Sequence, residues 1–254
     1  MFPIRDDNPT IRTPVATLVV IGLNVAAWAL LQGLGSELAL LRSVCELGLI
    51  PAELLGSAPL GTAVPLGPEA TCVLDGSSTW LTPLSSMFMH GGWFHIVGNL
   101  WFLWVFGDNV EDSMGPGRFA LFYLLCGLAA AAAQVASDPA STIPMVGASG
   151  AIGGVMGGYA RLYPRAHVQL LLILGFYVTT VWVPALLMLG YWFALQILGG
   201  LPTLAGGGPG VAFWAHAGGF VAGVVLVGAF RRPDYVAQHR RHTRRPGAAR
   251  PGAW

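Results

Sequence analysis

Long apolar segments separated by short polar stretches constrain this chain more than any other feature of its sequence. Most of them approach the roughly 20 residues that an α-helix needs to cross the hydrocarbon core of a bilayer. Only 10% of the residues are charged, whereas soluble domains carry about a quarter. The sequence therefore predicts an all-α membrane protein, a bundle of six transmembrane helices with a long outer loop at residues 33–92. We place the spans at about 14–32, 93–110, 117–136, 147–163, 181–199 and 212–230.

The arginines predict the orientation of this bundle. Every basic residue apart from histidine is Arg, and with the N-terminus inside only Arg42 falls on the outer side. The positive-inside rule favours that arrangement. We therefore expect a cytoplasmic segment at residues 1–13, a membrane domain at 14–230 and an Arg-rich cytoplasmic tail at 231–254. The tail is expected to anchor the chain at the lipid surface rather than to bind nucleic acid. The high Arg, Ala and Gly content favours a GC-rich bacterium as the source, so we expect the protein in a bacterial inner membrane.

The fifth span is the hardest to place. The apolar run from Val168 to Leu198 covers about 46 Å as a helix, against a hydrocarbon core of roughly 30 Å. Two short spans would fit the length poorly and would move the Arg-rich tail outside. We therefore expect residues 168–180 to form an interfacial or tilted lead-in, with Pro184 near the start of the span. The span and the Gly-rich stretch 200–210 form a candidate gate.

Two of the three cysteines, Cys45 and Cys72, fall in the long outer loop, whereas Cys126 falls in the third span. In an oxidising exterior the two loop cysteines can form a disulfide. Their spacing does not decide between a disulfide and two free thiols.

Five polar residues gather at one predicted depth, just inside the outer surface. His90, His95 and Asn99 stand at the start of the second span, Ser149 at the start of the fourth and His216 at the start of the sixth. All three of these spans enter the membrane from the outer face. Because polar groups are costly in lipid, such residues usually face the bundle interior or a wet cavity and mark function.

Stripes of small residues are expected to bring the fourth and sixth spans together. Small residues at every fourth position let helix backbones approach closely in lipid. Close approach would place the Ser149 hydroxyl within hydrogen-bond reach of the His216 imidazole. The stripes are Gly150, Gly154 and Gly158 in the fourth span and Ala215, Gly219 and Gly223 in the sixth.

This arrangement predicts acyl-transfer chemistry. A serine hydroxyl becomes a nucleophile when a neighbouring base takes its proton, and neutral histidine suits that role near pH 7. Since no Asp or Glu lies at the same predicted depth, we expect a Ser149–His216 dyad rather than a triad. Backbone N–H groups at the start of the fourth span, with His95 and Asn99, can donate to a developing oxyanion.

Four motifs, in this order along the chain, resemble those of the rhomboid family of intramembrane serine proteases. They are HxxxxHxxxN at residues 90–99, GxxxExxxG at 107–115, GxSG at 147–150 and the histidine motif at 215–218. A lone GxSG would carry little weight, but four ordered motifs at a common depth are specific. One departure is that Trp80 is followed by Leu81, where the family often has Arg.

The resemblance implies roles for these residues. Ser149 would be the nucleophile and His216 its general base and later acid. His95, Asn99 and the Ser149 backbone N–H would form the oxyanion hole. The remaining roles would be supporting: His90 tuning the hole or holding water, Gly147 admitting the substrate backbone, Gly150 completing the nucleophile motif, and Glu111 closing hydrogen bonds at the inner end of the second span.

The expected activity is hydrolysis of single-span transmembrane substrates near their outer ends, with membrane lipid as the surroundings, no cofactor and no metal. The oligomeric state is left open. One alternative is a catalytically silent relative that binds transmembrane clients, for which the retained polar set would have no use. Another is a transporter or a metal site built from His90, His95 and His216. It is disfavoured because neither an inverted repeat nor a carboxylate accompanies these histidines.

Overall fold

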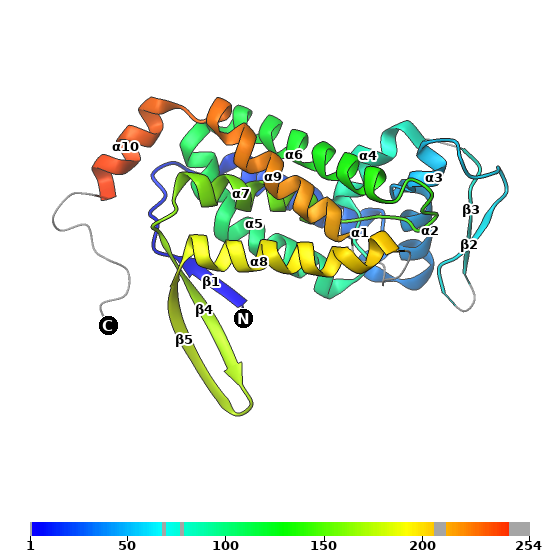
Figure 1. Ribbon diagram of the computed structural model, residues 1–254, viewed down its shortest axis with the longest axis horizontal. Coiled ribbons are helices and arrows are strands. Elements are labelled where there is room, and N and C mark those ends of the chain that lie inside the picture. Colours follow the sequence, from blue (N-terminus) through cyan, green and yellow to red (C-terminus); the bar gives the residue numbers. More distant parts are fainter. Residues whose placement is uncertain (1, 68–69, 77–78, 206–211, 244–254) are drawn as a thin grey trace.

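The computed structural model describes residues 2–67, 70–76, 79–205 and 212–243. Its helices run mostly along the longest dimension of the molecule (Figure 1). A helix lies at each of the six predicted spans. They are α1 (Val15–Leu30), α5 (Trp93–Met114), α6 (Pro116–Ser137), α7 (Ser149–Leu162), α8 (Ala185–Gly200) and α9 (Phe213–Phe230).

Three helices in the described part of the chain are long and apolar enough to cross a membrane by length and composition. They are α6, α9 and the segment Ala185–Leu204, in which α8 continues into the short 3-10 helix Leu201–Ala205. The other three fall short for identifiable reasons. α1 is apolar but shorter, α7 has only 14 residues, and α5 carries Asp108, Glu111 and Asp112 in its last turns.

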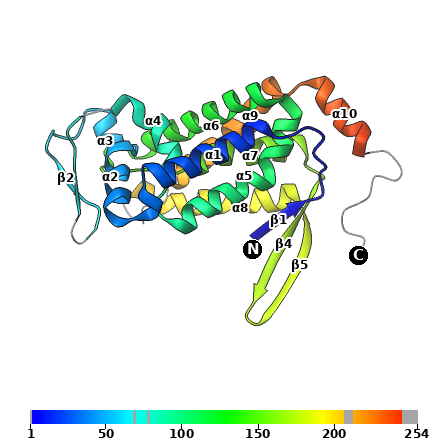
Figure 2. The ribbon, with the colours of Figure 1, turned by 180° about the vertical axis from the view of Figure 1, so that it is seen from behind.

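The short helix α7 is the centre of the bundle. Every residue from Gly150 to Ala160 is buried, and α5, α6 and α9 surround the helix. In the view from behind, α1 lies across α5 and α6, on the face opposite α8 (Figure 2). A helix that neighbours cover on all sides needs neither the length nor the apolar surface of one that faces lipid.

The small-residue stripes of α7 and α9 face each other. A Cβ added to Gly219 would overlap the carbonyl oxygen of Gly150, and one added to Gly223 would overlap that of Gly154. The two backbones are therefore in direct contact. Glycine is the only residue that allows this distance, because any larger residue has a Cβ.

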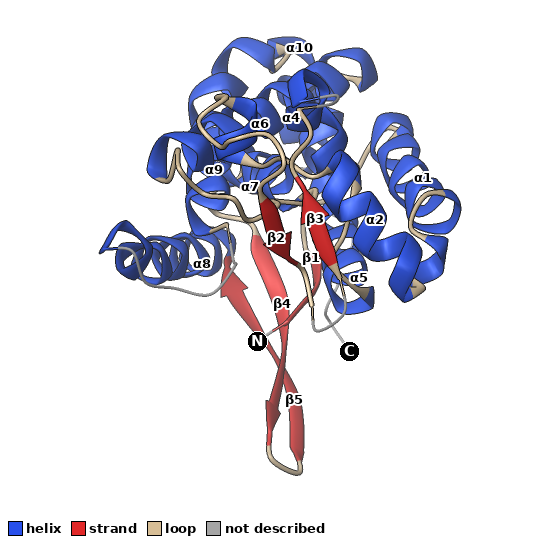
Figure 3. Ribbon diagram, turned by 90° about the vertical axis from the view of Figure 1, so that its right-hand side faces the viewer, coloured by secondary structure: helices blue, strands red, loops and turns tan. Residues whose placement is uncertain are grey.

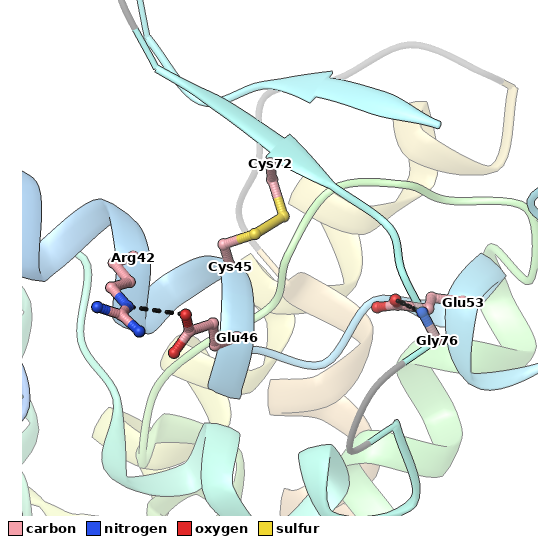
Figure 4. The surroundings of a disulfide bond; sticks show 6 residues. All are labelled: Arg42, Cys45, Glu46, Glu53, Cys72 and Gly76. Atoms are coloured by element: carbon pink, nitrogen blue, oxygen red, sulfur yellow. Dashed lines mark hydrogen bonds and ion pairs between the residues drawn. A yellow bond between two sulfur atoms is a disulfide. The ribbon is translucent and has the colours of Figure 1, made fainter. Parts of the chain in front are cut away.

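Residues 33–92 form one end of the molecule, called here the loop end. A disulfide joins Cys45 on α2 to Cys72 on β3, with the Cα atoms 5.5 Å apart (Figure 4). The structure thus resolves the question that spacing left open. Around the disulfide, Ile50, Val64 and Leu74 form a small core of their own. The elements are the 3-10 helices Gly33–Gly35, Thr79–Leu81 and Ser86–Phe88, the helices α2 (Glu37–Leu47), α3 (Pro51–Leu54) and α4 (Thr82–Ser85), and the strands β2 (Ala63–Pro65) and β3 (Thr71–Val73).

The prediction of an all-α fold is wrong for residues 167–184. These residues form an antiparallel hairpin of β4 (His167–Leu174) and β5 (Tyr177–Pro184), which projects from the bundle (Figure 3). A third strand, β1 (Phe2–Asp6), pairs with β4, so the strand order is β1-β4-β5. The β-branched and aromatic residues of β5 favour a strand, and Gly175 with φ +62° makes the turn. The expected lead-in at 168–180 is therefore replaced by strands, and α8 begins after Pro184 rather than at 181.

The other end of the molecule, called here the terminal end, holds β1, the start of α1 and the tail helix α10 (Pro233–Thr243). Arg12 forms an ion pair of 3.0 Å with the buried Asp112 and lies over the Tyr235 ring. His239 on α10 is hydrogen bonded to Asn8, with Nε2 and Oδ1 2.8 Å apart. The first part of the Arg-rich tail thus folds back on the bundle. Arg244, Arg245 and Arg250 lie outside the described residues.

Glu111 caps the start of α1. Its carboxylate accepts the backbone N–H of Ala16 at 2.9 Å and that of Thr17 at 2.7 Å, and it accepts the Thr17 hydroxyl at 2.8 Å. These N–H groups lack partners within their own helix, and a negative charge is favourable at a helix N-terminus. Glu111, near the end of α5, therefore ties that helix to α1.

Replacement of Glu111 by Ala should destabilise the protein by about 2–4 kcal/mol, because three buried donors lose a charged acceptor. Thermal unfolding in detergent measures the loss. Glu46→Ala is the matched control, since Glu46 is exposed and forms a surface ion pair with Arg42 along α2, an interaction worth at most about 1 kcal/mol. Equal unfolding temperatures for the two variants would show that the cap does not hold α1.

Candidate active site

Ser149 and His216 meet at the loop end of the bundle. Ser149 is the first residue of α7 and His216 lies in the first turn of α9. The Ser149 Oγ and the His216 Nε2 are 2.7 Å apart, the distance of a good hydrogen bond. The backbone contact between α7 and α9 begins one residue after Ser149, at Gly150, so it fixes the separation of the two side chains.

The second ring nitrogen of His216 has a partner that the sequence analysis missed. Its Nδ1 lies 2.8 Å from the Oε1 of Gln196 on α8. Gln196 is a neutral amide, so this contact brings no charge to the imidazole. A signal was present in the sequence, because Gln196 is the one amide in the apolar residues 185–200.

The ring of His95 is oriented by the turn before α5. The Gly91 N–H donates to the His95 Nδ1 at 3.2 Å, so the neutral ring carries its proton on Nε2. That nitrogen lies over Gly147, where an added Cβ would come within 2.7 Å of it and 3.3 Å of the Ser149 Oγ. Gly147 also has φ +129°, so glycine serves here both for backbone conformation and for clearance.

Asn99 lies one turn after His95 on α5 and is buried. In the described part of the chain, its Nδ2 has no hydrogen-bond partner. Leaving such a donor unpaired costs about 1–3 kcal/mol, so it is available to a ligand. Asn99 lines a cavity of about 580 Å³ whose walls include His95, Ser149, Trp192 and His216.

Three kinds of donor therefore lie at the cavity that Ser149 lines. They are the His95 Nε2–H, the Asn99 amide and the backbone N–H groups at the start of α7, which carry the positive end of the helix dipole. This combination suits an oxyanion that forms beside the Ser149 Oγ.

His90 contacts the site through His95. The two rings meet edge to face with centroids 5.2 Å apart. Gln32 holds the backbone of His90, accepting its N–H and donating to its carbonyl oxygen, each at 2.8 Å. The His90 ring is buried, and in the described part of the chain neither of its ring nitrogens has a hydrogen-bond partner. Its contact with His95 is therefore one of ring packing.

The remaining predicted site residues have packing positions. Gly150 faces α6, where an added Cβ would come within 2.6 Å of the Ala130 Cβ. Glu111 lies at the terminal end and caps α1. Among the residues that the structure describes, no group of three or more His, Cys, Asp or Glu side chains could hold a metal ion.

Comparison with known proteins adds independent information. Residues 77–233 match the Rhomboid domain family. The chain is 29% identical over 188 residues to the rhomboid protease GluP of Bacillus subtilis, which covers 73% of this chain and 33% of that protein. It is 30% identical to RHOMBOID-like protein 4 of Arabidopsis thaliana, covering 68% of this chain and 39% of that one.

A shorter match links the chain to the mitochondrial Rhomboid protein 1 of Saccharomyces cerevisiae, with 28% identity over 38% of this chain and 29% of the yeast protein. The chain spans about a third of the length of these relatives. The domain match and the apolar helices identify an integral, multi-pass membrane protein.

Asn99→Leu should slow the reaction of Ser149 with a fluorophosphonate probe by about 10²–10³-fold, the usual cost of one oxyanion donor. The leucine keeps the volume of the amide but cannot donate. Labelling of the purified protein over time measures the rate, and Ser141→Ala, at the wall of the same cavity, should react as fast as wild type. Labelling of Asn99→Leu at the wild-type rate would exclude Asn99 as a donor.

Proposed function

The chain belongs to the rhomboid family, and from that premise we propose that it is an intramembrane serine endopeptidase. It hydrolyses peptide bonds in or near the outer end of a substrate's transmembrane segment. The observation that carries the proposal is the 2.7 Å contact between the Ser149 Oγ and the His216 Nε2 at the wall of a cavity. A hydroxyl paired with imidazole beside unpaired donors suits acyl transfer.

The first half-reaction acylates Ser149. The His216 Nε2 takes the hydroxyl proton as the Oγ attacks the carbonyl carbon of the scissile bond. The negative charge that develops on the carbonyl oxygen is met by His95, Asn99 and the Ser149 backbone N–H. His216 then gives its proton to the departing amine, and the C–N bond breaks.

The second half-reaction releases the other product. Water enters the cavity, His216 takes a proton from it, and the resulting hydroxide attacks the acyl carbon. Collapse of the second tetrahedral intermediate returns the proton to the Ser149 Oγ. The same donors stabilise both intermediates, so no metal or organic cofactor is needed for the cycle.

Substrates are single-span membrane proteins whose helix unwinds locally. A helical backbone has its carbonyl groups hydrogen bonded internally, so attack requires a segment that leaves the helix inside a water-accessible cavity. The family resemblance implies a small residue such as Ala before the cut. A helix-weak sequence near the outer membrane surface suits both requirements.

The protein functions with six transmembrane helices, both termini in the cytoplasm and the loop end outside, in a bacterial inner membrane. Residues 1–13 and 231–254 flank the membrane domain of residues 14–230. The Cys45–Cys72 disulfide supports this orientation, because disulfides persist in oxidising compartments such as the bacterial exterior. The distribution of arginines supports it independently.

Incubation of the purified protein with a panel of single-span substrates tests the proposal. Ser149→Ala and His216→Ala should each lower cleavage by at least about 10³-fold, because neither dyad member has a substitute. Ser57→Ala, in the outer loop, should cut like wild type, and a metal chelator should leave cleavage unchanged. Undiminished cleavage by Ser149→Ala would refute the assignment. Stable substrate binding by wild type without cleavage would favour a silent client-binding protein.

A further inference from the structure

The amide of Gln196 has one orientation that satisfies all of its neighbours. Its Nε2 donates to the Trp192 carbonyl oxygen, one turn earlier on α8, at 3.2 Å. Its Oε1 therefore faces the His216 Nδ1, 2.8 Å away. An amide oxygen can only accept a hydrogen bond, so the proton of the neutral imidazole sits on Nδ1.

This proton position makes His216 ready to act as a base. With Nδ1 protonated, the lone pair of Nε2 points at the Ser149 hydroxyl, 2.7 Å away, as proton abstraction requires. The opposite tautomer would place an N–H against the hydroxyl and two acceptors against each other at Gln196. Gln196 thus selects the tautomer, and its oxygen also stabilises the imidazolium that forms during the reaction.

We propose that Gln196 is a positioning residue of the Ser149–His216 dyad and that the base is competent only while α8 is docked against α9. This inference rests on the proposed protease function. It assigns to a neutral amide on a third helix the orienting role that a carboxylate plays in serine-protease triads.

A second residue of α8 restricts the same ring. Trp192 lies four residues before Gln196, so both project from one face of the helix. Its ring centroid is 5.9 Å from that of His216, with the planes 36° apart. Gln196 fixes the rotation of the imidazole through a hydrogen bond, and Trp192 limits the space in which the ring can turn.

The orientation of His216 by Gln196 depends on the packing of α8, and only a narrow face of that helix is buried against the rest of the protein. Its buried residues are Ala185, Leu189, Gln196 and Gly200, a single stripe. Contact with α9 includes stacking of Phe193 on Phe220, with centroids 4.8 Å apart, and a hydrogen bond from Trp214 to the Gly200 carbonyl at 3.2 Å. Because Gln196 and His216 lie on different helices, their hydrogen bond exists only where α8 packs on α9.

Two substitutions at one position separate orientation from packing. Gln196→Met keeps the length and apolar volume but has no oxygen acceptor, whereas Gln196→Glu keeps an oxygen at the same reach. We expect Met to lower kcat by about 10–100-fold, a fraction of the 10²–10⁴-fold that general base catalysis contributes. KM should change by less than about threefold, and Glu should restore most of the rate. Leu195→Ala, exposed on the same helix, is the matched control and should behave like wild type.

The rate of Ser149 labelling by a fluorophosphonate provides a readout that needs no peptide substrate. It should fall with kcat in Gln196→Met and recover in Gln196→Glu. If the methionine variant does not fold, Gln196→Asn replaces it. Asparagine keeps the amide but is one methylene shorter, so its oxygen no longer reaches His216, and we expect the same loss of rate.

Three results would overturn the role of Gln196: wild-type kcat in the folded Met or Asn variant, a loss confined to KM, or an equal loss in Met and Glu. If wild type cleaves no substrate, the protease function fails instead, and the ratio of labelling rates still decides whether Gln196 orients His216.

Discussion

The direct contact between the backbones of α7 and α9 is the constraint on which the rest of the structure depends. At Gly219 and Gly223 a side chain would overlap the carbonyl oxygens of Gly150 and Gly154. Apolar side chains gain little free energy by moving from lipid into a protein interface. Close packing of helix backbones is therefore a main contribution to helix association in a membrane. The same contact makes α7 the buried centre around which α5, α6 and α9 are arranged.

The position of the proposed dyad is a consequence of that contact. Because Ser149 begins α7 and His216 lies in the first turn of α9, fixing the two helix axes fixes the distance between hydroxyl and imidazole. A short helix also presents its N-terminal N–H groups within the protein rather than at its surface. The other groups of the site come from two further helices, His95 and Asn99 from α5 and Gln196 from α8. Four helices, α5, α7, α8 and α9, therefore supply the groups of one site.

The features that depend on composition and spacing could be predicted from the sequence alone. The six helices lie where apolar runs were placed, and membership of the rhomboid family, first indicated by four motifs, is confirmed. Features that depend on non-local pairing could not be obtained in this way. An apolar run such as 168–198 is compatible with either a helix or strands. The pairing of β4 with the distant β1 leaves no periodic signal in the sequence. The partners of Glu111 on α1 and of Gln196 on α9 are likewise set by how helices rotate against each other.

Labelling of Ser149 by a fluorophosphonate in Gly219→Ala tests the central claim most directly. A methyl group at that position must push α9 away from α7, and a displacement of about 1 Å in a catalytic group can cost roughly 10²-fold in rate. The account predicts slow labelling in Gly219→Ala and normal labelling in Gly22→Ala, where an added methyl group on α1 meets open space. Wild-type labelling by a folded Gly219→Ala protein would contradict it, because the dyad would then not depend on the approach of the two helices.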